Sequence, residues 1–282
     1  MCLSQDEMKL YQEQGYLFMP ALFSKSEVEI MKEQLPTVFA EASPRRILEK
    51  QGNMVRSVYG LHRTNEVFKR LSQHPRLVDA AMQLLDSDVY IYQFKVNAKA
   101  ALGGDVWEWH QDFIFWQKED AMLTPRVINA AVLLDDMTEF NGPIFLIPGS
   151  HVEGVIDMSA RNGNGNGNGN GNGNGNGHST PAWINDLTAD LKYSLSKDVI
   201  ENLVRTKGIV APKGPAGSVL FFDANIVHAS PSNLSPFDRA VAFVTYNSVE
   251  NIPADVEKPR PDFLVDRQVI PIVPLADDAL FM

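Results

Sequence analysis

The stretch from Trp107 to Trp116, Trp-Glu-Trp-His-Gln-Asp-Phe-Ile-Phe-Trp, holds the residues best suited to chemistry. Its histidine and aspartate, His110 and Asp112, stand two positions apart among aromatic side chains. In an extended strand alternate side chains share a face, so we expect these two to point the same way and Gln111 to point away. One imidazole and one carboxylate are two of the three ligands that hold non-haem Fe(II) in a facial triad. The pattern therefore predicts that a second histidine completes a metal site.

His228 is the best candidate for that third ligand. It follows an apolar strand in the sequence Phe-Asp-Ala-Asn-Ile-Val-His-Ala-Ser, more than a hundred residues after the first pair. The other histidines lie in an unassigned segment, before a helix, in a turn or beside a low-complexity tract, namely His62, His74, His151 and His178. A lone histidine is more often structural than a ligand, so the metal prediction depends on the combination with His110 and Asp112.

Arg239 adds a second indication. It opens an apolar strand, residues 240–247, where a guanidinium would be costly to bury without an anionic partner. Eleven residues after His228, it can lie on the neighbouring antiparallel strand, and its planar head is suited to a bidentate grip on a carboxylate. A dicarboxylic 2-oxo acid that chelates iron would need such an anchor at its far end. The alternative is that Arg239 caps the strand through a surface ion pair.

The segments that must position these residues are expected to be mainly helical before residue 88 and mainly strands after it. Before residue 88 we expect helices at 4–14, from Ser24 or Ser26 to just before Pro36, and at 75–85, with strands at 16–19 and 55–59. After it, apolar and β-branched runs predict strands at 89–97, 127–134, 144–151, 208–211, 218–222 and 240–247. Helices followed by many short strands indicate a mostly β fold with flanking helices, a sandwich or jelly roll with an N-terminal helical layer.

Residues 162–177 are eight consecutive Asn-Gly pairs. Such a tract has no apolar face to bury, so we expect a disordered loop inserted in a single domain that spans residues 1–282. A tolerated surface insertion is the favoured interpretation. A lid over the site is the alternative, because the tract follows the turn at 148–151, and residues 186–205 could form a helical part of the same excursion.

Composition narrows the class of protein. Hydrophobic residues make up 44% and charged residues 21%, as in ordinary globular proteins, and the net charge of −10 argues against a nucleic-acid partner. No run of about 18–20 apolar residues predicts a membrane span. A single cysteine, Cys2, excludes a disulfide framework, and no signal-peptide pattern is visible. We therefore expect a cytoplasmic protein, a monomer or homodimer, that acts on a small molecule.

The combination of His110-x-Asp112, His228 and Arg239 resembles the phytanoyl-CoA dioxygenase superfamily of Fe(II)/2-oxoglutarate oxygenases, and within it the ectoine hydroxylases. The resemblance covers most of the chain outside the Asn-Gly tract. The shared features are Gln14-Gly15-Tyr16-Leu17, Val55-Arg56-Ser57, His74-Pro75-Arg76-Leu77, Ser87-Asp88-Val89-Tyr90-Ile91, Gln93 with Asn97, Phe113 and Trp116 after the Asp, Glu119-Asp120, and Asn141-Gly142-Pro143 leading to Ile147-Pro148-Gly149-Ser150-His151.

The resemblance implies a double-stranded β-helix with a cupin-like core and a complete ligand set. Fe(II) would be held by His110, Asp112 and His228. The cosubstrate 2-oxoglutarate would be held by Arg239, Ser230 and Asn97, and the substrate by Gln93, Trp116, Phe222, Phe243 and Phe115. On the residues alone, Phe222 and Phe243 could be plain core, and Gln93 and Asn97 could be structural.

The sequence departs from the ectoine hydroxylase pattern beside the metal. Ile114 and Phe115 stand where that pattern has Glu-Thr, and Ala121 stands where it has Gly. An apolar pair in place of a carboxylate and a hydroxyl predicts a substrate other than ectoine. We expect a compact polar heterocycle or an amino-acid-like metabolite, chosen in part by Ile114 and Phe115.

The reaction expected from the resemblance is hydroxylation of an unactivated C–H bond, in which O2 and 2-oxoglutarate are consumed and succinate and CO2 released. Asp112 favours hydroxylation over halogenation, because halogenating relatives carry a small residue there. Desaturation, epimerisation and ring formation remain alternatives, since they begin with the same hydrogen abstraction. A zinc enzyme or a cupin-like isomerase could use the same ligands, but neither explains Arg239 at its spacing. A non-catalytic binding domain is disfavoured because every expected ligand is present.

Overall fold

Two antiparallel sheets make up the centre of the computed structural model, which describes residues 2–50, 52, 54–156, 183, 187 and 191–282. The large sheet has seven strands in the order β1-β8-β6-β10-β4-β3-β2 and the small sheet has three in the order β5-β9-β7. The strands are β1 Tyr16–Met19, β2 Arg46–Leu48, β3 Val55–Tyr59, β4 Val89–Lys99, β5 Trp107–His110, β6 Val127–Leu133, β7 Phe145–Leu146, β8 Val219–Asp223, β9 His228–Ser230 and β10 Arg239–Ser248.

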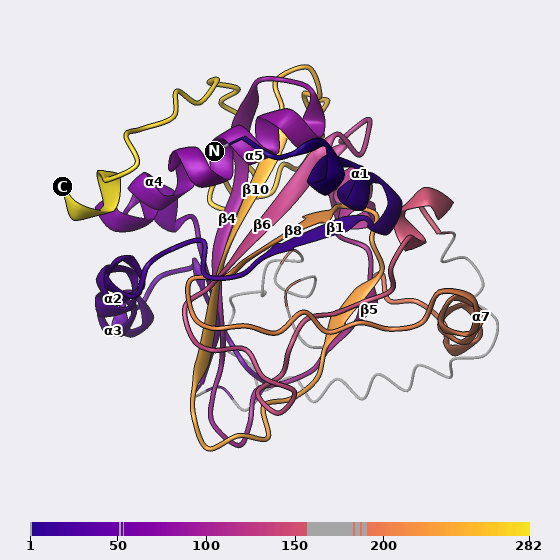
Figure 1. Cartoon of the computed structure of the whole chain (residues 1–282), viewed down its shortest axis with the longest axis horizontal. Coiled ribbons are helices and arrows are strands. Elements are labelled where there is room, and N and C mark those ends of the chain that lie inside the picture. Colours follow the sequence, from indigo (N-terminus) through magenta and orange to yellow (C-terminus); the bar gives the residue numbers. More distant parts are fainter. Residues whose placement is uncertain (1, 51, 53, 157–182, 184–186, 188–190) are drawn as a thin grey trace.

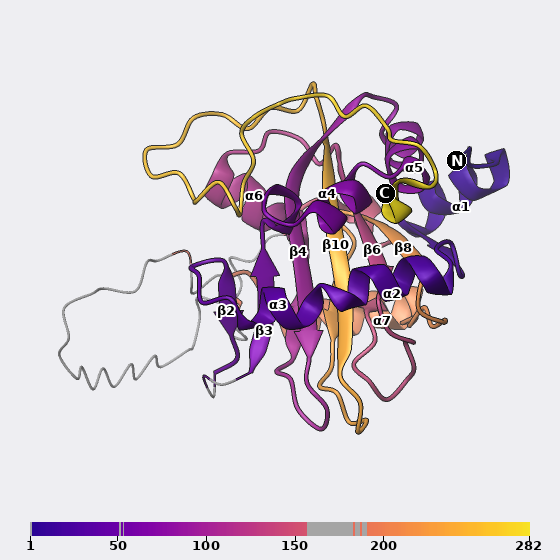
Figure 2. The ribbon, with the colours of Figure 1, turned by 90° about the vertical axis from the view of Figure 1, so that its left-hand side faces the viewer.

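The helices are α1 Gln5–Gln14, α2 Lys25–Glu33, α3 Leu35–Ala40, α4 Glu66–Ser72, α5 Pro75–Leu85, α6 Asp112–Asp120 and α7 Lys197–Lys207. Helices α2 to α5 cover one face of the large sheet (Figure 2), and Figure 1 shows β5 and α7 on the opposite side of that sheet from α4 and α5. Apolar helix residues such as Leu77 and Val78 pack on strand residues such as Val96 and Val244 in one core. Removal of this apolar surface from water is what holds the helical layer on the sheet.

β4 and β10 form the longest pairing of the large sheet, from Arg239 opposite Lys99 to Ser248 opposite Val89, with one irregularity between Thr245 and Tyr246. Alternation along β4 sends Phe94 and Val96 into the helix-side core. The same alternation sends Gln93, Lys95, Asn97 and Lys99 to the other face, where all four line a cavity. The strand thus divides an apolar core from a polar interior.

The predicted mostly β fold with an N-terminal helical layer is confirmed, and so are many of its elements. The helix at residues 5–14 has the expected capping box, in which the side chains of Ser4 and Glu7 each accept from the other's backbone N–H. Gly15 ends it with a φ of 76°, a left-handed conformation that glycine adopts without strain. The strands expected near 16–19, 55–59, 89–97, 127–134, 218–222 and 240–247 are present.

Other expectations were wrong. The strand predicted at 144–151 is only Phe145–Leu146, followed by a 3₁₀ helix at Ser150–Glu153. Residues 208–211 contribute one bridge, between Leu146 and Val210, because the partner strand is too short to continue the pairing. The helix expected from Ser24 or Ser26 to just before Pro36, by contrast, is present as α2, which Ser24 caps. A separate helix, α3, follows, with Pro36 in its first turn, where the missing N–H costs no hydrogen bond.

Some expectations are not resolved. The Asn-Gly tract at 162–177 lies outside the described residues. Part of the segment 186–205 does too, and its described part contains α7 from Lys197. The organisation as one domain stays a prediction. Among the described residues, no helix combines the length and the apolar character that a membrane crossing requires.

Candidate active site

The His-x-Asp motif does not form the continuous extended strand that we predicted. β5 ends at His110, and α6 begins at Asp112. Gln111, between them, is buried, and its side-chain Nε2 donates to the carbonyls of Gly154 at 2.7 Å and Asn225 at 2.6 Å. His110 Nε2 and Asp112 Oδ1 still lie 3.6 Å apart. The first turn of a helix favours a carboxylate, since the unpaired N–H groups carry partial positive charge.

His228 faces this pair from β9, as predicted. Its backbone is the direct partner of His110 in the β5–β9 pairing, and the two imidazole rings lie 4.2 Å apart. His228 Nε2 is 3.8 Å from Asp112 Oδ2, and one ligand atom from each of the three residues lies within 4.8 Å of the others. The cross-strand register is therefore what brings together residues separated by more than a hundred positions.

The second nitrogen of each imidazole is held by the backbone. His110 Nδ1 lies 2.6 Å from the carbonyl of Glu108, and His228 Nδ1 lies 3.0 Å from that of Ile226. Such contacts fix the ring orientation and leave Nε2 for a metal. Two imidazoles and one carboxylate on one side of a cavity fit Fe(II) with open coordination positions.

The electrostatics suit a cation. Burial opposes ionisation of Asp112, but the positive charge of Lys95 and contacts with His228 and His110 outweigh it, so the pKa of this carboxyl lies well below its usual value. Burial, aided by His110, lowers the pKa of His228 to about 4. At neutral pH the site therefore offers an ionised carboxylate and a neutral imidazole at His228, the protonation states that metal binding requires.

Asn129 of β6 contacts the metal ligand Asp112. The sequence did not predict this contact. Asn129 Nδ2 donates to Asp112 Oδ2 at 2.8 Å, and its Oδ1 accepts from the Thr245 hydroxyl at 2.7 Å. All three side chains are buried. The contact fixes the orientation of the ligating carboxylate.

Asn129→Leu is expected to lower the affinity for Fe(II) by about 10- to 100-fold, the usual cost of losing a group that orients a metal ligand. Anaerobic titration of the apoprotein with Fe(II) measures it. Asn202→Leu, on the exposed surface of α7, is the matched control and should bind Fe(II) as the unmodified protein does. Unchanged affinity in Asn129→Leu would show that the carboxylate needs no such support.

Arg239 reaches the same cavity by a route that we did not predict. It is not on a strand adjacent to His228 in one sheet, because β9 belongs to the small sheet and β10 to the large one. The chain crosses between the sheets over residues 231–238, so the two residues face each other across the interior. Arg239 Nε donates to the Asn141 carbonyl at 3.2 Å, and Nη2 donates to the Gly142 carbonyl and lies 3.4 Å from Ser230 Oγ.

Arg239 is only 3% exposed, and among the described residues no carboxylate lies within ion-pair distance of it. Burial lowers its pKa to about 10, with Asp135 acting in the opposite sense, so the guanidinium stays charged at neutral pH. The alternative of a surface ion pair is therefore wrong. A buried cation that opens on a cavity fits the carboxylate of a bound molecule.

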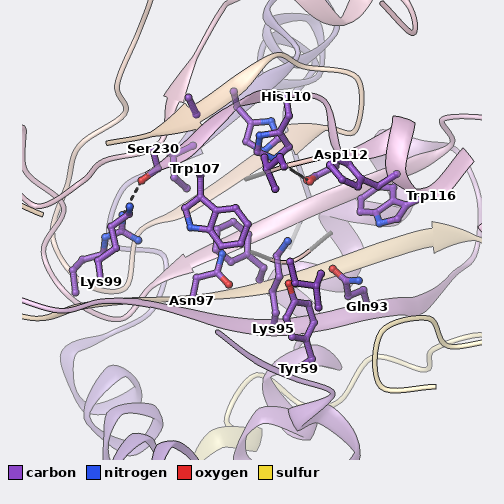
Figure 3. A pocket seen from close by; sticks show the side chains of 18 of the residues that line it. Tyr59, Gln93, Lys95, Asn97, Lys99, Trp107, His110, Asp112, Trp116 and Ser230 are labelled. Carbon is purple, nitrogen blue, oxygen red and sulfur yellow. Dashed lines mark hydrogen bonds and ion pairs between the residues drawn. The ribbon is translucent and has the colours of Figure 1, made fainter. Parts of the chain in front are cut away.

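One cavity connects the metal ligands to Arg239. Figure 3 shows Lys99 and Ser230 at one end, Gln93 and Trp116 at the other, and His110 and Asp112 between them. The lining residues are Tyr59, Gln93, Lys95, Asn97, Lys99, Trp107, His110, Asp112, Phe115, Trp116, Ile144, Leu187, Leu191, His228, Ala229, Ser230, Arg239, Phe243 and Arg260. An elongated molecule can therefore contact the metal ligands and Arg239 together.

The other predicted site residues divide into two groups. Asn97, Gln93, Trp116, Phe243 and Phe115 line the cavity. Asn97 Oδ1 accepts from the Ser57 hydroxyl at 2.8 Å, and Gln93 Nε2 donates to the Leu264 carbonyl at 2.8 Å.

Phe222 does not line the cavity. It is 1% exposed and packs behind His228, with the rings 5.2 Å apart. Of the two positions where the sequence departs from ectoine hydroxylases, Phe115 faces the cavity and Ile114 is buried in the core beside it. Of the two, Phe115 is therefore the residue that a molecule in the cavity would contact.

Sequence reasoning missed three basic residues of the cavity, Lys95, Lys99 and Arg260. The two lysines had a signal, since every second residue from Gln93 to Lys99 is polar in an otherwise apolar strand. Arg260 had none, because it lies in the irregular C-terminal segment, where no periodicity indicates which side chains point inward.

The fold and site together define a mononuclear non-haem iron oxygenase whose cavity also takes a carboxylate-bearing cosubstrate. Comparison with known proteins agrees: the phytanoyl-CoA dioxygenase (PhyH) family matches residues 11–241. The chain belongs to this family.

Curated relatives and solved structures are similar over nearly the whole chain. L-proline trans-4-hydroxylase of Streptomyces griseoviridis is 38% identical and covers 96% of this chain and 95% of its own length. Ectoine dioxygenase of Bordetella bronchiseptica is 34% identical, with coverage of 96% and 85%. EctD from S. alaskensis with 2-oxoglutarate and 5-hydroxyectoine has a TM-score of 0.76 and 31% identity, with coverage of 94% and 84%; it has also been solved with bound Fe.

The protein is thus an Fe(II)/2-oxoglutarate-dependent dioxygenase that hydroxylates a small polar metabolite. His110, Asp112 and His228 would hold the iron, which together with 2-oxoglutarate and O2 supplies the oxidising power for C–H hydroxylation. Arg239 and Ser230 line the same cavity, where they would orient the cosubstrate. The walls at Phe115, Trp116 and Phe243 are apolar and would keep water away from the reacting carbon.

Proposed function

We propose that this enzyme hydroxylates a compact cyclic amino acid, and that L-proline is the first compound to test. The observation that carries the proposal is a second arginine in the cavity, Arg260, which pairs with Asp120 at the end of the helix that carries Trp116. Full-length similarity to a protein named L-proline trans-4-hydroxylase supports it.

The side chain of Arg260 is held in position near the Trp116 end of the cavity by an ion pair. It forms a two-point ion pair with Asp120, of which the Nε–Oδ1 contact measures 2.8 Å, and Asp120 also accepts from the Tyr92 hydroxyl at 2.5 Å. Asp120 closes the helix that carries Trp116, and Tyr92 precedes Gln93. Arg239 lies at the opposite end beside Ser230, so the cavity has one guanidinium at each end, and a substrate carboxylate would share that of Arg260 with Asp120.

The walls between Arg260 and the metal ligands favour a small ring. Phe115, Trp116 and Phe243 present aromatic faces and edges, and Gln93 adds an amide. A free amino acid with a saturated ring would place its carboxylate at Arg260, its polar atoms near Gln93 and its apolar ring carbons among the aromatics, toward the metal ligands.

The substrate test follows 2-oxoglutarate consumption in the Fe(II)-loaded enzyme with L-proline, its ring-size homologues and ectoine. We expect L-proline to raise the rate of succinate formation. We also expect the mass of the product to exceed that of L-proline by one oxygen atom. Loss of two hydrogens without added oxygen would indicate a desaturase instead. Turnover of ectoine with no turnover of any free amino acid would contradict the proposal.

Arg260→Leu is expected to raise the KM for L-proline by about ten- to a hundredfold, the usual worth of a hydrogen bond to a charged group, with little change in the KM for 2-oxoglutarate. Steady-state kinetics with each compound varied in turn measures both. Arg205→Leu, on the exposed surface of α7, is the matched control. An equal rise in both KM values would instead assign Arg260 a structural role.

We also propose that the enzyme works in the cytoplasm as a monomer or homodimer. The single cysteine, Cys2, which leaves no scope for a disulfide framework, supports a reducing compartment. Light scattering during size-exclusion chromatography tests the oligomeric state.

A further inference from the structure

Residues 191–195 join the two elements that carry the first two metal ligands. At one end, the Leu195 backbone N–H donates to the Trp109 carbonyl of β5 at 2.8 Å. Near the other end, the Tyr193 hydroxyl donates to Glu119 Oε1 of α6 at 2.5 Å. β5 ends at the ligating histidine, and α6 begins at the ligating aspartate. The segment is therefore tied to both sides of the metal site.

Glu119 occupies a position that a helix by itself disfavours for a carboxylate. It lies in the last turn of α6, where the unpaired carbonyl groups carry partial negative charge. Lys192 Nζ contacts its Oε1 at 2.6 Å and lies 5.1 Å from the centroid of the Tyr193 ring. Two successive residues thus bind one carboxylate oxygen, and the ammonium and the carboxylate together fix the position of the phenol ring.

The ring of Tyr193 packs against Phe115, the cavity residue at which this chain departs from the ectoine hydroxylase pattern. The two ring centroids lie 5.0 Å apart with an interplanar angle of 74°, an edge-to-face pair. Phe115 makes a second edge-to-face pair with the metal ligand His110, at 6.1 Å and 87°. Both separations fall in the range in which aromatic rings attract each other. Phe115 lines the cavity and Tyr193 lies outside the lining, so Tyr193 supports this wall from the side away from the ligand.

We propose that Tyr193 is a positioning residue that holds the Phe115 ring against His110 and thereby decides which carbon of the substrate is oxidised. Neighbouring carbons of a small saturated ring are only about 1.5 Å apart, so a small movement of the wall changes the carbon that faces the metal ligands. The inference rests on the proposed function, because it needs a substrate whose ring contacts Phe115.

A purely structural role for Tyr193 would have different consequences. Loss of a stabilising contact lowers the unfolding temperature and the amount of active enzyme, but each active molecule still forms the same products. Loss of a positioning contact changes the products that each active molecule forms. The ratio between product isomers therefore distinguishes the two roles, since it does not depend on how much of the enzyme is active.

The test uses the Fe(II)-loaded enzyme with 2-oxoglutarate and the compound that it turns over, L-proline first. For Tyr193→Leu, succinate is compared with hydroxylated product, and the product isomers are separated by chromatography against authentic hydroxyprolines. An aromatic pair is worth about a two- to tenfold preference for the paired position of the rings. We therefore expect the minor isomers to gain on the major one by about that factor. Succinate should also exceed product, because a misplaced C–H bond leaves part of the 2-oxoglutarate turnover without hydroxylation.

Two further variants separate the ring of Tyr193 from its hydroxyl contact. Tyr193→Phe keeps the edge-to-face pair with Phe115 and should retain most of the selectivity. Glu119→Gln weakens the hold on Tyr193 and leaves both rings in place, so it should shift the isomer ratio in the same direction as Tyr193→Leu by a smaller factor. Phe39→Leu, at a partly buried ring on α3 outside the cavity, is the matched control and should leave the ratio unchanged.

A double substitution shows whether Tyr193 acts through Phe115. In a Phe115→Leu background, Tyr193→Leu should cause no further change in the isomer ratio, because the ring that it positions is gone. The affinities for Fe(II) and 2-oxoglutarate, measured anaerobically by calorimetry, should be the same in the Tyr193 variants and the unmodified enzyme.

Any of three results would overturn the proposal. The first is an isomer ratio in Tyr193→Leu, or in Glu119→Gln should the former not fold, that matches the unmodified enzyme. The second is a full effect of Tyr193→Leu in the Phe115→Leu background, which would show that Tyr193 does not act through Phe115. The third is a fall in Fe(II) affinity with an unchanged isomer ratio, which would make the role structural. Failure of the proposed function looks different: the unmodified enzyme would then leave every free amino acid unchanged, and the same variants would be compared on the compound that it does oxidise.

Discussion

Replacing His228 with alanine is expected to abolish 2-oxoglutarate-dependent turnover and to lower Fe(II) affinity by more than about a hundredfold, since even the loss of a supporting group costs 10- to 100-fold. The physical reason is that His228 Nε2 is the one donor that β9 contributes to a triad otherwise built from β5 and α6. The measurements are succinate formation with substrate present and the iron content of the protein after anaerobic loading and gel filtration.

A matched histidine outside the triad controls for the loss of an imidazole. His74 caps α5, where its Nδ1 accepts from the backbone of Arg76, and asparagine can replace that acceptor. His74→Asn should therefore keep both iron and turnover. Full activity in His228→Ala would mean that the three residues are not the metal ligands, and the assignment of the whole site would be lost with them.

Arg239→Leu is expected to raise the Kd for 2-oxoglutarate by about 30-fold or more, because loss of one partner from a buried, hydrogen-bonded charge pair costs about 2–5 kcal/mol. Arg239→Lys should recover only part of this affinity, since an ammonium cannot reproduce the planar two-point contact. Calorimetry with the anaerobic Fe(II)-loaded enzyme measures both variants.

The binding defect must be separated from misfolding, because Arg239 holds the Asn141 and Gly142 carbonyls as well as any ligand. The thermal unfolding midpoint and the Fe(II) affinity of Arg239→Leu show whether the variant is correctly folded. Arg205→Leu, on the surface of α7, is the control that shows how the loss of an exposed guanidinium affects stability and binding. An Arg239→Leu protein that folds, binds iron and keeps its affinity for 2-oxoglutarate would exclude the arginine as the anchor.

The metal ligands could be predicted from sequence because their chemistry is carried by residue type. The spacing of His110 and Asp112 placed them together even though the backbone between them is not the strand that we expected. Arg239 was assigned to the correct cavity for a partly wrong reason. Its distance along the chain from His228 suggested adjacent strands, whereas the chain crosses from one sheet to the other. Separation in sequence does not distinguish these two geometries.

The remaining site residues depend on tertiary context. Asn129 is a single polar residue in an apolar strand, and only the packing of β6 against α6 reveals that it contacts Asp112. Arg260 is brought to the cavity by a C-terminal segment that has no regular structure and whose position is set by contacts such as that between Leu264 and Gln93. Local patterns carry no information about such contacts, because they form only when distant parts of the chain meet.

The alternation of β4 has a consequence for how this enzyme can diverge. Gln93 and Lys99 lie six residues apart on one strand, a separation of about 20 Å. Substitutions that far apart, with no shared partner, usually have additive free-energy effects. Gln93 lies at the Trp116 end of the cavity and Lys99 at the Ser230 end. If the substrate binds at the Gln93 end, as proposed, and 2-oxoglutarate at the Ser230 end, mutations that change the choice of metabolite can accumulate at one end of the strand without weakening cosubstrate binding at the other.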